Sequence, residues 1–535
     1  KDTAILRVEP AQLDQLLHPH IDSEAEKGFT ALGTGLPASP GAAVGTIVFD
    51  AHLAHDKNEA GEKVILVRNE TSPEDLIGMN ASQGILTARG GMTSHAAVVA
   101  RGMGKCCVAG CSSAKINESQ GTLTFGGKIY KEGDTITLNG SNGNVYEGSV
   151  PVTDPELSGD FGTLMEWADE RKEMIVKTNA DTPHDTAIAI KFGAEGIGLC
   201  RTEHMFFEAT RIKAVREMIV AKDKEKREIA LAKIEPFQQE DFEGMFKELD
   251  GKPMIIRLLD PPLHEFLPQA EKDIEGVAAE INVTVDELKE TIESLHEFNP
   301  MLGFRGCRLG VVYPEISAMQ ARAIFKAALN VPGSKPWVEV PLTGKVEEYL
   351  IIKKIIEDVA EKLGAKDKVD YKIGTMIEVP RAALTADEFA TECDFISFGT
   401  NDLTQMTCGF SRDDAGSFLG KYVDLGIYEK DPFQTIDQEG VGKLMEHCII
   451  TSREVNPDIH IGICGEHGGD PESVEFCHCI GLDEVSCSPY RVPIARLAAA
   501  HAAIKYPYEE DCDCNDDDCC EGHEKEHEHK DGCCC

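Results

Sequence analysis

The clearest candidate for a chemically reactive residue is His95, in the stretch GGMTSHAAVVARG. Gly90 and Gly91 permit a tight turn and the close approach of another molecule, and AAVVAR is typical of the start of a helix. A histidine at that place lies near helix N-terminal amides, which suit a phosphoryl group. Because imidazole is a competent nucleophile at neutral pH, His95 is a candidate phosphoryl carrier. The alternative is a histidine that caps a turn, and the spacing alone favours that alternative.

Four charged side chains further along the chain form a second candidate set. Glu378 in GTMIEVPRA and Asp402 in FGTNDLTQM offer the hard carboxylate oxygens that Mg²⁺ prefers. Arg201 in GLCRTEHMF and Arg257 in IIRLLD can grip a phosphate bidentately and stabilise charge during its transfer. Taken singly, each carboxylate is explained better by a helix cap or an ion pair, and each arginine can be a structural salt bridge.

Cys464 in GICGEHGGDP, which we place at the end of the last predicted strand, adds a thiol. A thiol can donate a proton to an enolate carbon and remove it in the reverse reaction. Burial in the core, the commonest fate of a free cysteine, is the alternative. Arg305 in GFRGCR is a weaker candidate, which we expect to support the other residues.

These side chains need a scaffold that brings distant segments together. After about Met174, apolar strands alternate with amphipathic helices, which is typical of a parallel α/β fold. About eight strand candidates follow, the number that closes a (β/α)₈ barrel: MIVKTNA, GIGLCRTE, MIIRLLD, the weaker MLGFRG, VEVPLTG, KIGTMIEVP, FISFGTND and HIGICGE. The carboxyl ends of barrel strands form the catalytic face, so the residues there would converge on one pocket: Arg201, Arg257, Arg305, Glu378, Asn401, Asp402 and Cys464.

The remaining sequence predicts the domain organisation. We expect residues 1–34 to be a residual linker, 35–150 a strand-rich domain that carries His95, 151–173 a second linker, and 174–507 the barrel. The strand-like runs of the first domain are AAVGTIVF, EKVILVR, GILTAR, TLTF, TITL and NVYEG. The predicted fold class is therefore α/β, a swivelling β-rich domain followed by a TIM barrel.

The segment 508–535 has a different composition, with many acidic residues, cysteines and histidines and almost no apolar side chains. We expect it to be either a disordered acidic tail or a chelator of a metal such as Zn²⁺ or Cu⁺. The candidate ligands are Cys512, Cys514, Cys519, Cys520, His523, His527, His529 and Cys533 to Cys535.

Charge and composition exclude several partners. A formal net charge of −40 and a pI near 4.8 argue against nucleic acid and anionic membranes. The sequence has no apolar run of the roughly 18 residues that span a bilayer and no signal-like N-terminus, so we expect a cytoplasmic protein. The 19 cysteines are scattered through apolar segments, which indicates reduced thiols.

The motifs around these candidates resemble, in order, those of the phosphoenolpyruvate (PEP)-utilising enzymes, over roughly residues 1–507. They are GGMTSHAAVVARGMGKCCVAG, RTEHMF, RLLDPPLHEF, NPMLGFRGCR, GTMIEVPRAAL, SFGTNDLTQM, FSRDDAG, GICGEHGGDPESVEFC and SPYRVPIARLAAA. The resemblance implies that His95 carries the phosphoryl group, that Cys464 is the proton donor and that Thr93 is a candidate regulatory phosphorylation site. It implies Mg²⁺ on Glu378 and Asp402, a homodimer through the barrel, and contacts to pyruvate or PEP from Arg201, Arg257, Glu378, Gly399, Thr400, Asn401 and Asp402.

Within the family, GMGKCC and SFGTNDLTQMTCGFSRDDAG resemble the dikinases, which convert ATP, phosphate and pyruvate to AMP, PEP and diphosphate. Phe304 in MLGFRG resembles the PEP synthases instead. A phosphocarrier enzyme of sugar uptake and a metal-binding protein built on the tail are more distant alternatives. Nothing in residues 1–34 resembles an ATP-grasp nucleotide domain, so we expect this chain to carry only the half-reaction between phosphohistidine and pyruvate. ATP and phosphate would then be reached through a nucleotide domain absent from the chain.

Overall fold

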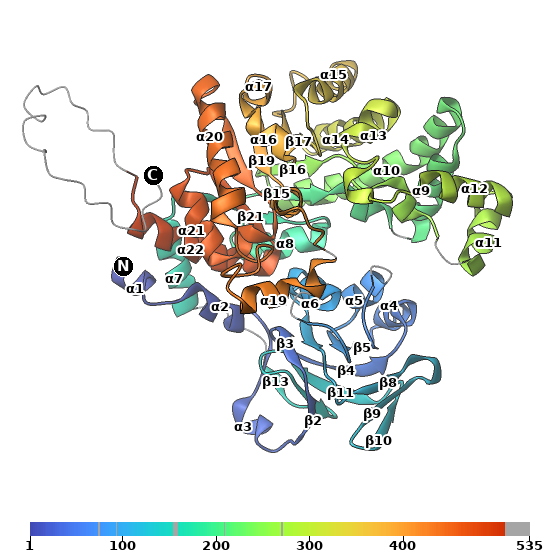
Figure 1. Ribbon diagram of the computed structural model, residues 1–535, viewed down its shortest axis with the longest axis vertical. Coiled ribbons are helices and arrows are strands. Elements are labelled where there is room, and N and C mark those ends of the chain that lie inside the picture. Colours follow the sequence, from blue (N-terminus) through green and yellow to red (C-terminus); the bar gives the residue numbers. More distant parts are fainter. Residues whose placement is uncertain are drawn as a thin grey trace, which may run out of the picture.

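The computed structural model describes residues 1–72, 75–91, 94–153, 159–207, 209–268, 271–412 and 414–508. The predictions for Thr93 and for the cysteines and histidines of the tail lie outside the described residues. The described part divides into a β-rich body in the first third of the chain and a larger α/β body, drawn one below the other in Figure 1.

The β-rich body is built on one eight-stranded sheet in the order β2-β12-β11-β4-β5-β6-β7-β3. The centre of the sheet, from β4 to β7, is parallel, and the remaining pairs are antiparallel. The strands are β2 (Ala31–Thr34), β3 (Leu36–Ser39), β4 (Ala42–Val48), β5 (Val64–Arg68), β6 (Gly84–Thr87), β7 (Cys106–Ala109), β11 (Thr135–Asn139) and β12 (Asn144–Glu147).

Both faces of this sheet are apolar because its inner strands are buried on both sides. In β5, Val64 and Leu66 enter one hydrophobic cluster, and Ile65 and Val67 enter another. The helices α4 (Ala51–Glu59), α5 (Leu76–Ala81) and α6 (His95–Gly102) belong to the first side. A three-stranded sheet belongs to the second: β8 (Lys115–Asn117), β9 (Thr122–Phe125) and β10 (Lys128–Lys131), with the 3₁₀ turn η2 (Glu118–Gln120). All six predicted strand runs and the predicted helix after His95 are confirmed.

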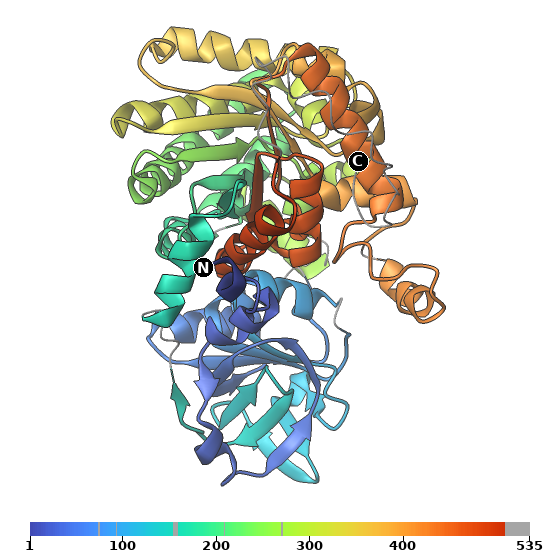
Figure 2. The same cartoon turned by 90° about the vertical axis from the view of Figure 1, so that its left-hand side faces the viewer.

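The larger body is a closed barrel of eight parallel strands in sequence order. Figure 2 shows the strands surrounded by helices above the β-rich body. The strands are β14 (Ile175–Asn179), β15 (Ile197–Arg201), β16 (Pro253–Arg257), β17 (Lys335–Val340), β18 (Lys372–Ile377), β19 (Phe395–Phe398), β20 (His460–Ile463) and β21 (Glu484–Cys487). The predicted α/β class with a β-rich domain and a (β/α)₈ barrel is confirmed.

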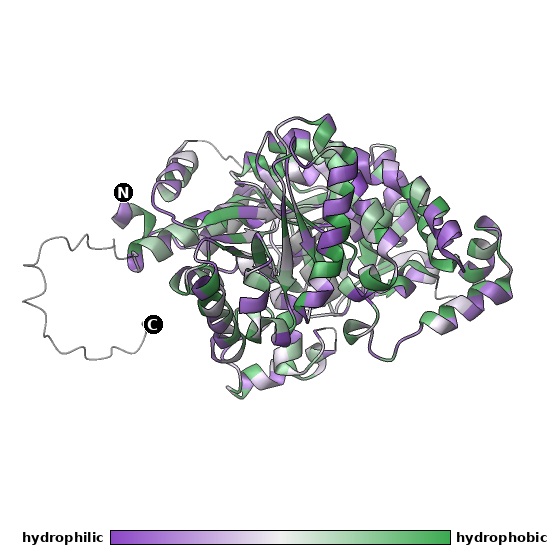
Figure 3. Cartoon of the chain, turned by 90° about the horizontal axis from the view of Figure 1, so that it is seen from above, coloured by the Kyte–Doolittle hydropathy of each residue, from purple (hydrophilic) through white to green (hydrophobic). Residues whose placement is uncertain are grey.

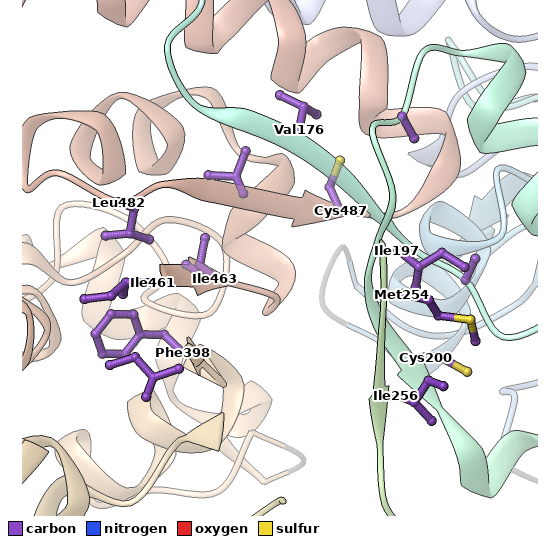
Figure 4. Close-up of a cluster of buried hydrophobic side chains, with 14 of the residues drawn as sticks. Val176, Ile197, Cys200, Met254, Ile256, Phe398, Ile461, Ile463, Leu482 and Cys487 are labelled. Carbon is purple, nitrogen blue, oxygen red and sulfur yellow. The ribbon is translucent and has the colours of Figure 1, made fainter. Parts of the chain in front are cut away.

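Side chains alternate between the two faces of the barrel wall. Apolar residues such as Val176, Ile256 and Ile461 pack outward in one continuous core, part of which Figure 4 shows. The outer helices carry hydrophobic and hydrophilic residues on different faces (Figure 3), so they cover this core and keep a polar surface.

The main helices around the barrel are α7 (Asp160–Asp169), α8 (Pro183–Lys191), α9 (Ala209–Val220), α10 (Lys224–Leu249), α11 (Glu271–Glu280), α12 (Val285–Leu295), α13 (Cys307–Val312), α14 (Pro314–Asn330), α15 (Val346–Leu363), α16 (Pro380–Leu384), α17 (Ala386–Ala390), α18 (Thr400–Cys408), α19 (Leu419–Asp424), α20 (Lys443–Val455), α21 (Pro471–Cys479) and α22 (Val492–Lys505). Short turns complete the loops: η3 (Thr202–Phe206), η4 (Leu263–Phe266), η5 (Pro300–Leu302), η6 (Ala415–Ser417), the π-helical η7 (Gln438–Gly442), η8 (Glu466–Gly469) and η9 (Pro489–Arg491).

One predicted barrel strand is wrong. MLGFRG forms η5 and a turn that leads into α13, because Gly306 has a φ of +57° and breaks the extended backbone. The missing strand is β21, with the sequence EVSC. Cys464 therefore follows β20, the seventh strand of the barrel, and the prediction that it ends the last strand is also wrong.

Residues 1–34 contain regular structure on both bodies. Helices α1 (Asp2–Ile5) and α2 (Pro10–Leu16) bring Ile5 and Leu13 into the barrel core, followed by β1 (His20–Ile21) and α3 (Ser23–Glu26). Strand β1 pairs with β13 (Val152–Thr153), so the two connections between the bodies run side by side. The domain boundaries assigned from the sequence stay predictions. In the described part of the chain, no helix is both long and apolar enough to span a membrane.

Candidate active site

The carboxyl ends of the barrel strands gather buried, oppositely charged side chains. Arg257 is the last residue of β16, and Arg305 comes from the turn before α13. Arg257 Nη1 lies 3.1 Å from Asp260 Oδ2, and Arg305 Nη2 donates to Asp260 Oδ2 at 2.9 Å and to Asp402 Oδ2 at 3.0 Å. Both arginines are less than a tenth exposed. Arg305 is therefore part of the charged network itself, although MLGFRG forms no strand.

Two carboxylates in this network were missed by sequence reasoning. Asp260 joins the two arginines, and Glu203 binds Arg257 Nη2. Burial opposes ionisation of Asp260, but Arg257 and Arg305 together hold its pKa below the ordinary value. Both residues stand inside quoted motifs, RLLDPP and RTEHMF, so an acid close to a strand-end arginine was the available signal.

Glu378 follows β18 directly and is 1% exposed. Its Oε1 accepts a hydrogen bond of 2.6 Å from the backbone amide of Leu342. Leu342 has a φ of +58°, a left-handed conformation that is strained for a branched side chain and that often marks functional sites. Burial, together with the negative charges of Asp260 and Asp402, raises the pKa of Glu378 well above its ordinary value.

The segment Gly399 to Asp402 forms the start of α18 beside Glu378. A Cβ at Gly399 would lie 2.9 Å from Glu378 Oε2 and 2.7 Å from Met376 Sδ, so a larger residue there would displace these side chains. Thr400 Oγ1 lies 2.8 Å from His467 Nδ1, and Asn401 Oδ1 accepts a bond of 3.2 Å from a backbone amide of η8. The predicted substrate-contact segment is thus fixed to the loop after Cys464.

We call the carboxyl-terminal end of the barrel, where these residues lie, the barrel mouth. Cys464 lies at this end and is 1% exposed. Its Sγ is 3.6 Å from Ser397 Oγ, which in turn donates to Glu339 Oε1 at 2.6 Å. Burial raises the pKa of the Cys464 thiol to about 12, so it stays protonated at neutral pH. Burial also raises the pKa of Glu339 to about 7. A polar chain therefore runs from Cys464 into the barrel interior.

Arg201, the last residue of β15, is half-buried at the same mouth. Its backbone amide donates to Asp181 Oδ1 at 2.6 Å, and Asp181 Oδ2 lies 2.7 Å from His204 Nδ1. The charge of Arg201 adds to that of Arg257 and Arg305 in lowering the pKa of Asp260, and it opposes the rise that burial causes in the pKa of Cys464. The structure thus gathers all the predicted barrel residues on one face.

His95 lies on the other body, as the first residue of α6. Its side chain is outside the described ones, but the backbone shows why the preceding residues matter. Gly90 has a φ of +108°, which favours glycine, and a Cβ at Gly91 would meet nothing within 4 Å. Ser94 Oγ is buried without a hydrogen-bond partner among the described residues. The turn therefore leaves open space at Gly91, close to the start of the helix.

A second charged cluster fills the amino-terminal end of the barrel. Lys177 forms an ion pair with Glu484, whose Oε2 lies 2.6 Å from His460 Nε2, and the Lys177 ammonium lies 4.3 Å from the Trp337 ring centroid. Lys177 and Glu484 are each 1% exposed. Despite burial, Lys177 and His460 lower the pKa of Glu484 to about 2. Sequence reasoning missed this cluster because it did not identify β21.

Comparison with family models interprets these two bodies. The model described as PEP-utilising enzyme, PEP-binding domain, matches residues 155–504, which is more than half of the chain. The chain belongs to the PEP-utilising enzymes. A second model, PEP-utilising enzyme, mobile domain, matches residues 60–143 of this family member and includes His95.

Curated relatives of this PEP-utilising enzyme agree with that assignment. It is 55% identical over 511 residues to pyruvate, phosphate dikinase of Clostridium symbiosum, which covers 94% of the chain and 58% of the relative. It is 56% identical over 511 residues to pyruvate, phosphate dikinase 2 of Oryza sativa subsp. japonica, with the same coverage. For the Rhizobium meliloti (strain 1021) dikinase the values are 55% over 511 residues, 94% and 57%. The chain spans a little over half the length of these relatives.

Proposed function

We propose that the chain carries out the pyruvate half-reaction of pyruvate, phosphate dikinase. In this half-reaction a phosphoryl group passes reversibly between His95 and the enol oxygen of pyruvate. The observation that carries the proposal is the barrel mouth, where two arginines and four carboxylates are held together beside a protonated thiol. The dikinase relatives favour this reading over the synthase that Phe304 suggested.

The residues at the mouth fit Mg²⁺. Glu378 Oε2 faces Gly399, while Oε1 is held by the Leu342 amide. The charge of Asp402 acts on Glu378, and the Asp402 oxygens accept hydrogen bonds from Arg305 and Gln405. The raised pKa of Glu378, caused by burial and by neighbouring carboxylates, is the electrostatic sign of a site that accepts a cation. Among the described residues no group of three or more His, Cys, Asp and Glu side chains could hold a metal. Two carboxylates, with substrate and water completing the shell, suit Mg²⁺. When bound, the ion would neutralise the enolate and phosphoryl oxygens.

The arginines provide the remaining positive charge. Arg257 and Arg305 are held rigidly by Asp260, and Arg201 adds a third guanidinium, which forms no ion pair with any of the described residues. We infer that Arg201 and Arg257 contact the substrate and that Arg305 positions Asp260 and Asp402. Fixed donors of this kind stabilise charge that develops during transfer because they need no reorganisation.

Cys464 supplies the proton. In the direction of pyruvate formation, the phosphoryl group leaves the enol oxygen for the His95 imidazole, and the enolate carbon takes the thiol proton. This leaves pyruvate and a thiolate, which regains a proton before the next turnover. In the reverse direction the thiolate removes a methyl proton, and the enolate oxygen accepts the phosphoryl group. Because burial raises the pKa of the thiol to about 12, the thiolate is a strong base and can remove a methyl proton.

The full dikinase reaction with ATP and phosphate, the use of pyruvate or PEP as substrate, and the homodimer are parts of the same proposal. The β-rich body would carry the phosphoryl group between the barrel and the nucleotide step, and its paired connections β1 and β13 would allow the swivel.

Incubation of the full chain with PEP labelled in its phosphoryl group and Mg²⁺ tests the proposal. We expect acid-labile label on His95 and release of pyruvate, with no label in His95→Asn. Substitution of an exposed histidine outside the site, His184→Asn, is the matched control and should keep the label. Stable label elsewhere, or none in the parent chain, would overturn the proposal.

A further inference from the structure

Glu339 is a carboxyl group inside the barrel to which the proposed reaction gives no role. It lies on β17 and is fully buried. Its Oε2 has no hydrogen-bond partner among the described residues. Burial of a polar atom without a partner opposes folding, and an apolar side chain of similar size would avoid this effect. The position therefore favours a chemical role over a purely structural one.

Ser397 connects Glu339 to the thiol of Cys464. Ser397 Oγ donates a hydrogen bond of 2.6 Å to Glu339 Oε1 and lies 3.6 Å from Cys464 Sγ. None of the three side chains is more than 2% exposed. A hydroxyl group has one hydrogen to donate and two lone pairs that accept. While that hydrogen points to Glu339, the Ser397 oxygen can only accept a hydrogen from the thiol.

The single hydroxyl hydrogen couples the protonation of the two ends of this chain of groups. In one arrangement Cys464 is a thiol, Ser397 donates to Glu339, and Glu339 is a carboxylate. In the other arrangement Glu339 holds a proton and donates it to Ser397, which donates to a Cys464 thiolate. The two arrangements have the same total charge and differ only by the shift of two hydrogens. A proton can therefore pass between the thiol and the carboxyl group without a net change of charge.

The proposed reaction needs such a connection because Cys464 gains or loses one proton in every turnover. Cys464 is fully buried, so bulk water does not contact the thiol directly. Its Sγ makes two hydrogen-bond contacts with the described residues, one to Ser397 and one of 3.6 Å to the backbone carbonyl oxygen of Phe398. A carbonyl oxygen accepts a hydrogen bond but does not take up a proton at neutral pH. The contact with Ser397 is the one that leads to a titratable group.

Charges around Glu339 keep it able to hold or release a proton. Burial raises the pKa of Glu339 to about 7. The hydrogen bond from Ser397 and the positive charge of Arg257 on β16 oppose this rise, and the negative charges of Glu484 on β21 and Asp260 add to it. A group that passes protons at neutral pH must populate both of its protonation states there. Glu339 meets this requirement.

We propose that Ser397 and Glu339 form a proton relay through which the Cys464 thiol exchanges its proton with solvent. Both are positioning residues, because they act on the substrate through Cys464, and their role rests on the proposed function. In pyruvate formation, the enolate carbon takes the thiol proton, the thiolate takes the Ser397 hydroxyl proton, and the Ser397 oxygen takes the Glu339 proton. Glu339 then regains a proton from water at Oε2. In PEP formation each proton moves the opposite way.

Two exchange rates measured on the same sample test the relay. Exchange of carbon label between pyruvate and PEP reports the half-reaction, and NMR in deuterated water reports the loss of pyruvate methyl hydrogen. In the parent chain, hydrogen loss should keep pace with carbon exchange. In Glu339→Gln and Ser397→Ala, hydrogen loss per carbon exchange should fall roughly tenfold, because the proton stays on the thiol and returns to carbon. A structural defect would slow both processes and leave their ratio unchanged.

Two further variants serve as controls for this ratio. Ser452→Ala removes the hydroxyl of another fully buried serine, which lies one helical turn from the buried Cys448 on α20 and away from the barrel mouth. It should keep the parent ratio. Ser397→Thr retains a hydroxyl and should stay close to the parent ratio. A parent ratio in both Glu339→Gln and Ser397→Ala would overturn the relay.

A measurement without substrate separates the relay from the proposed function. The infrared S–H stretching band that is lost in Cys464→Ala reports the Cys464 thiol. After transfer to deuterated water, this band should decay roughly tenfold more slowly in Glu339→Gln than in the parent. Equal decay in the two chains would overturn the relay. If the parent exchanges no carbon label while Glu339→Gln still slows the decay, the proposed function fails and the relay stands.

Discussion

The two ends of the barrel hold similar charged residues in opposite electrostatic states. At the amino-terminal end, Glu484 is balanced by Lys177 and His460, and its pKa falls to about 2. At the carboxyl-terminal end, burial and neighbouring carboxylates raise the pKa of Glu378 well above the ordinary value, despite nearby arginines. Both glutamates are 1% exposed. The two glutamates are therefore equally buried and differ in the charges around them. We infer that the paired cluster stabilises the fold and that the cluster with excess negative charge binds a ligand.

Replacing Glu378 by glutamine should give the largest effect, and it should fall on function. The substitution removes one of the two proposed cation ligands, so phosphoryl transfer from PEP to His95 should decrease by roughly a thousandfold or more. Stability should stay level or rise, because burial and the neighbouring carboxylates outweigh the nearby arginines and disfavour the charged form of Glu378. Single-turnover labelling and urea unfolding measure the two quantities. A large loss of stability with transfer intact would reverse our assignment of the two ends.

The same substitution at the other end, Glu484→Gln, should act on stability. It leaves the Lys177 ammonium buried without a counter-charge, which costs roughly 3–5 kcal/mol in free energy of unfolding. Urea unfolding at pH 7 checks the value. Once folded, the variant should transfer phosphoryl at close to the parent rate. A variant as stable as the parent would show that the cluster is not a paired structural one.

Cys464→Ala should slow the proton step strongly while leaving the fold in place. Exchange of pyruvate methyl protons with deuterated water, followed by NMR, should slow by roughly a hundredfold or more, because a positioned acid or base contributes that much. Cys487→Ala is the control, since Cys487 is also buried at a strand end but packs in the apolar core, as Figure 4 shows. Equal exchange rates in both variants would remove Cys464 from the mechanism.

Glu339, between the two ends, should give the smallest effect, a pH dependence. Its pKa is raised from 4.5 to about 7, so the folded state holds a proton there that the unfolded chain releases. The stabilisation is fully present below pH 4.5 and is lost as the pH rises through about 7. Compared with the parent, Glu339→Gln should therefore gain relative stability between these pH values, by up to about 1.4 kcal/mol per pH unit.

Urea unfolding at several pH values measures that difference. Glu484 behaves with the opposite sign: its stabilisation is present above pH 4.5 and is lost as the pH falls through about 2. A constant difference between Glu339→Gln and the parent across the range would contradict the raised pKa of Glu339.

Much of the barrel mouth could be predicted from the sequence, because each residue stands just after an apolar strand and parallel strands end on one face. Asp260 and Glu203 could not be separated from ordinary helix-start acids without their distances to Arg257. The charged cluster at the amino-terminal end of the barrel was missed for a different reason. Strand β21 has only four residues and begins with the charged Glu484, so its sequence has no clear strand pattern. It is recognised as a strand by its pairing with β14 and β20. MLGFRG was predicted to be a strand because it contains apolar residues, but Gly306 at its end turns the chain.

The central claim is that the mouth and His95 together form one reversible half-reaction. Exchange of carbon-labelled pyruvate into PEP, measured with the full chain and Mg²⁺ in the absence of ATP, AMP and phosphate, tests it most directly. The account predicts steady exchange in the parent, none in His95→Asn and none in Glu378→Gln. Exchange that persists in His95→Asn, or that never occurs in the parent, would contradict it.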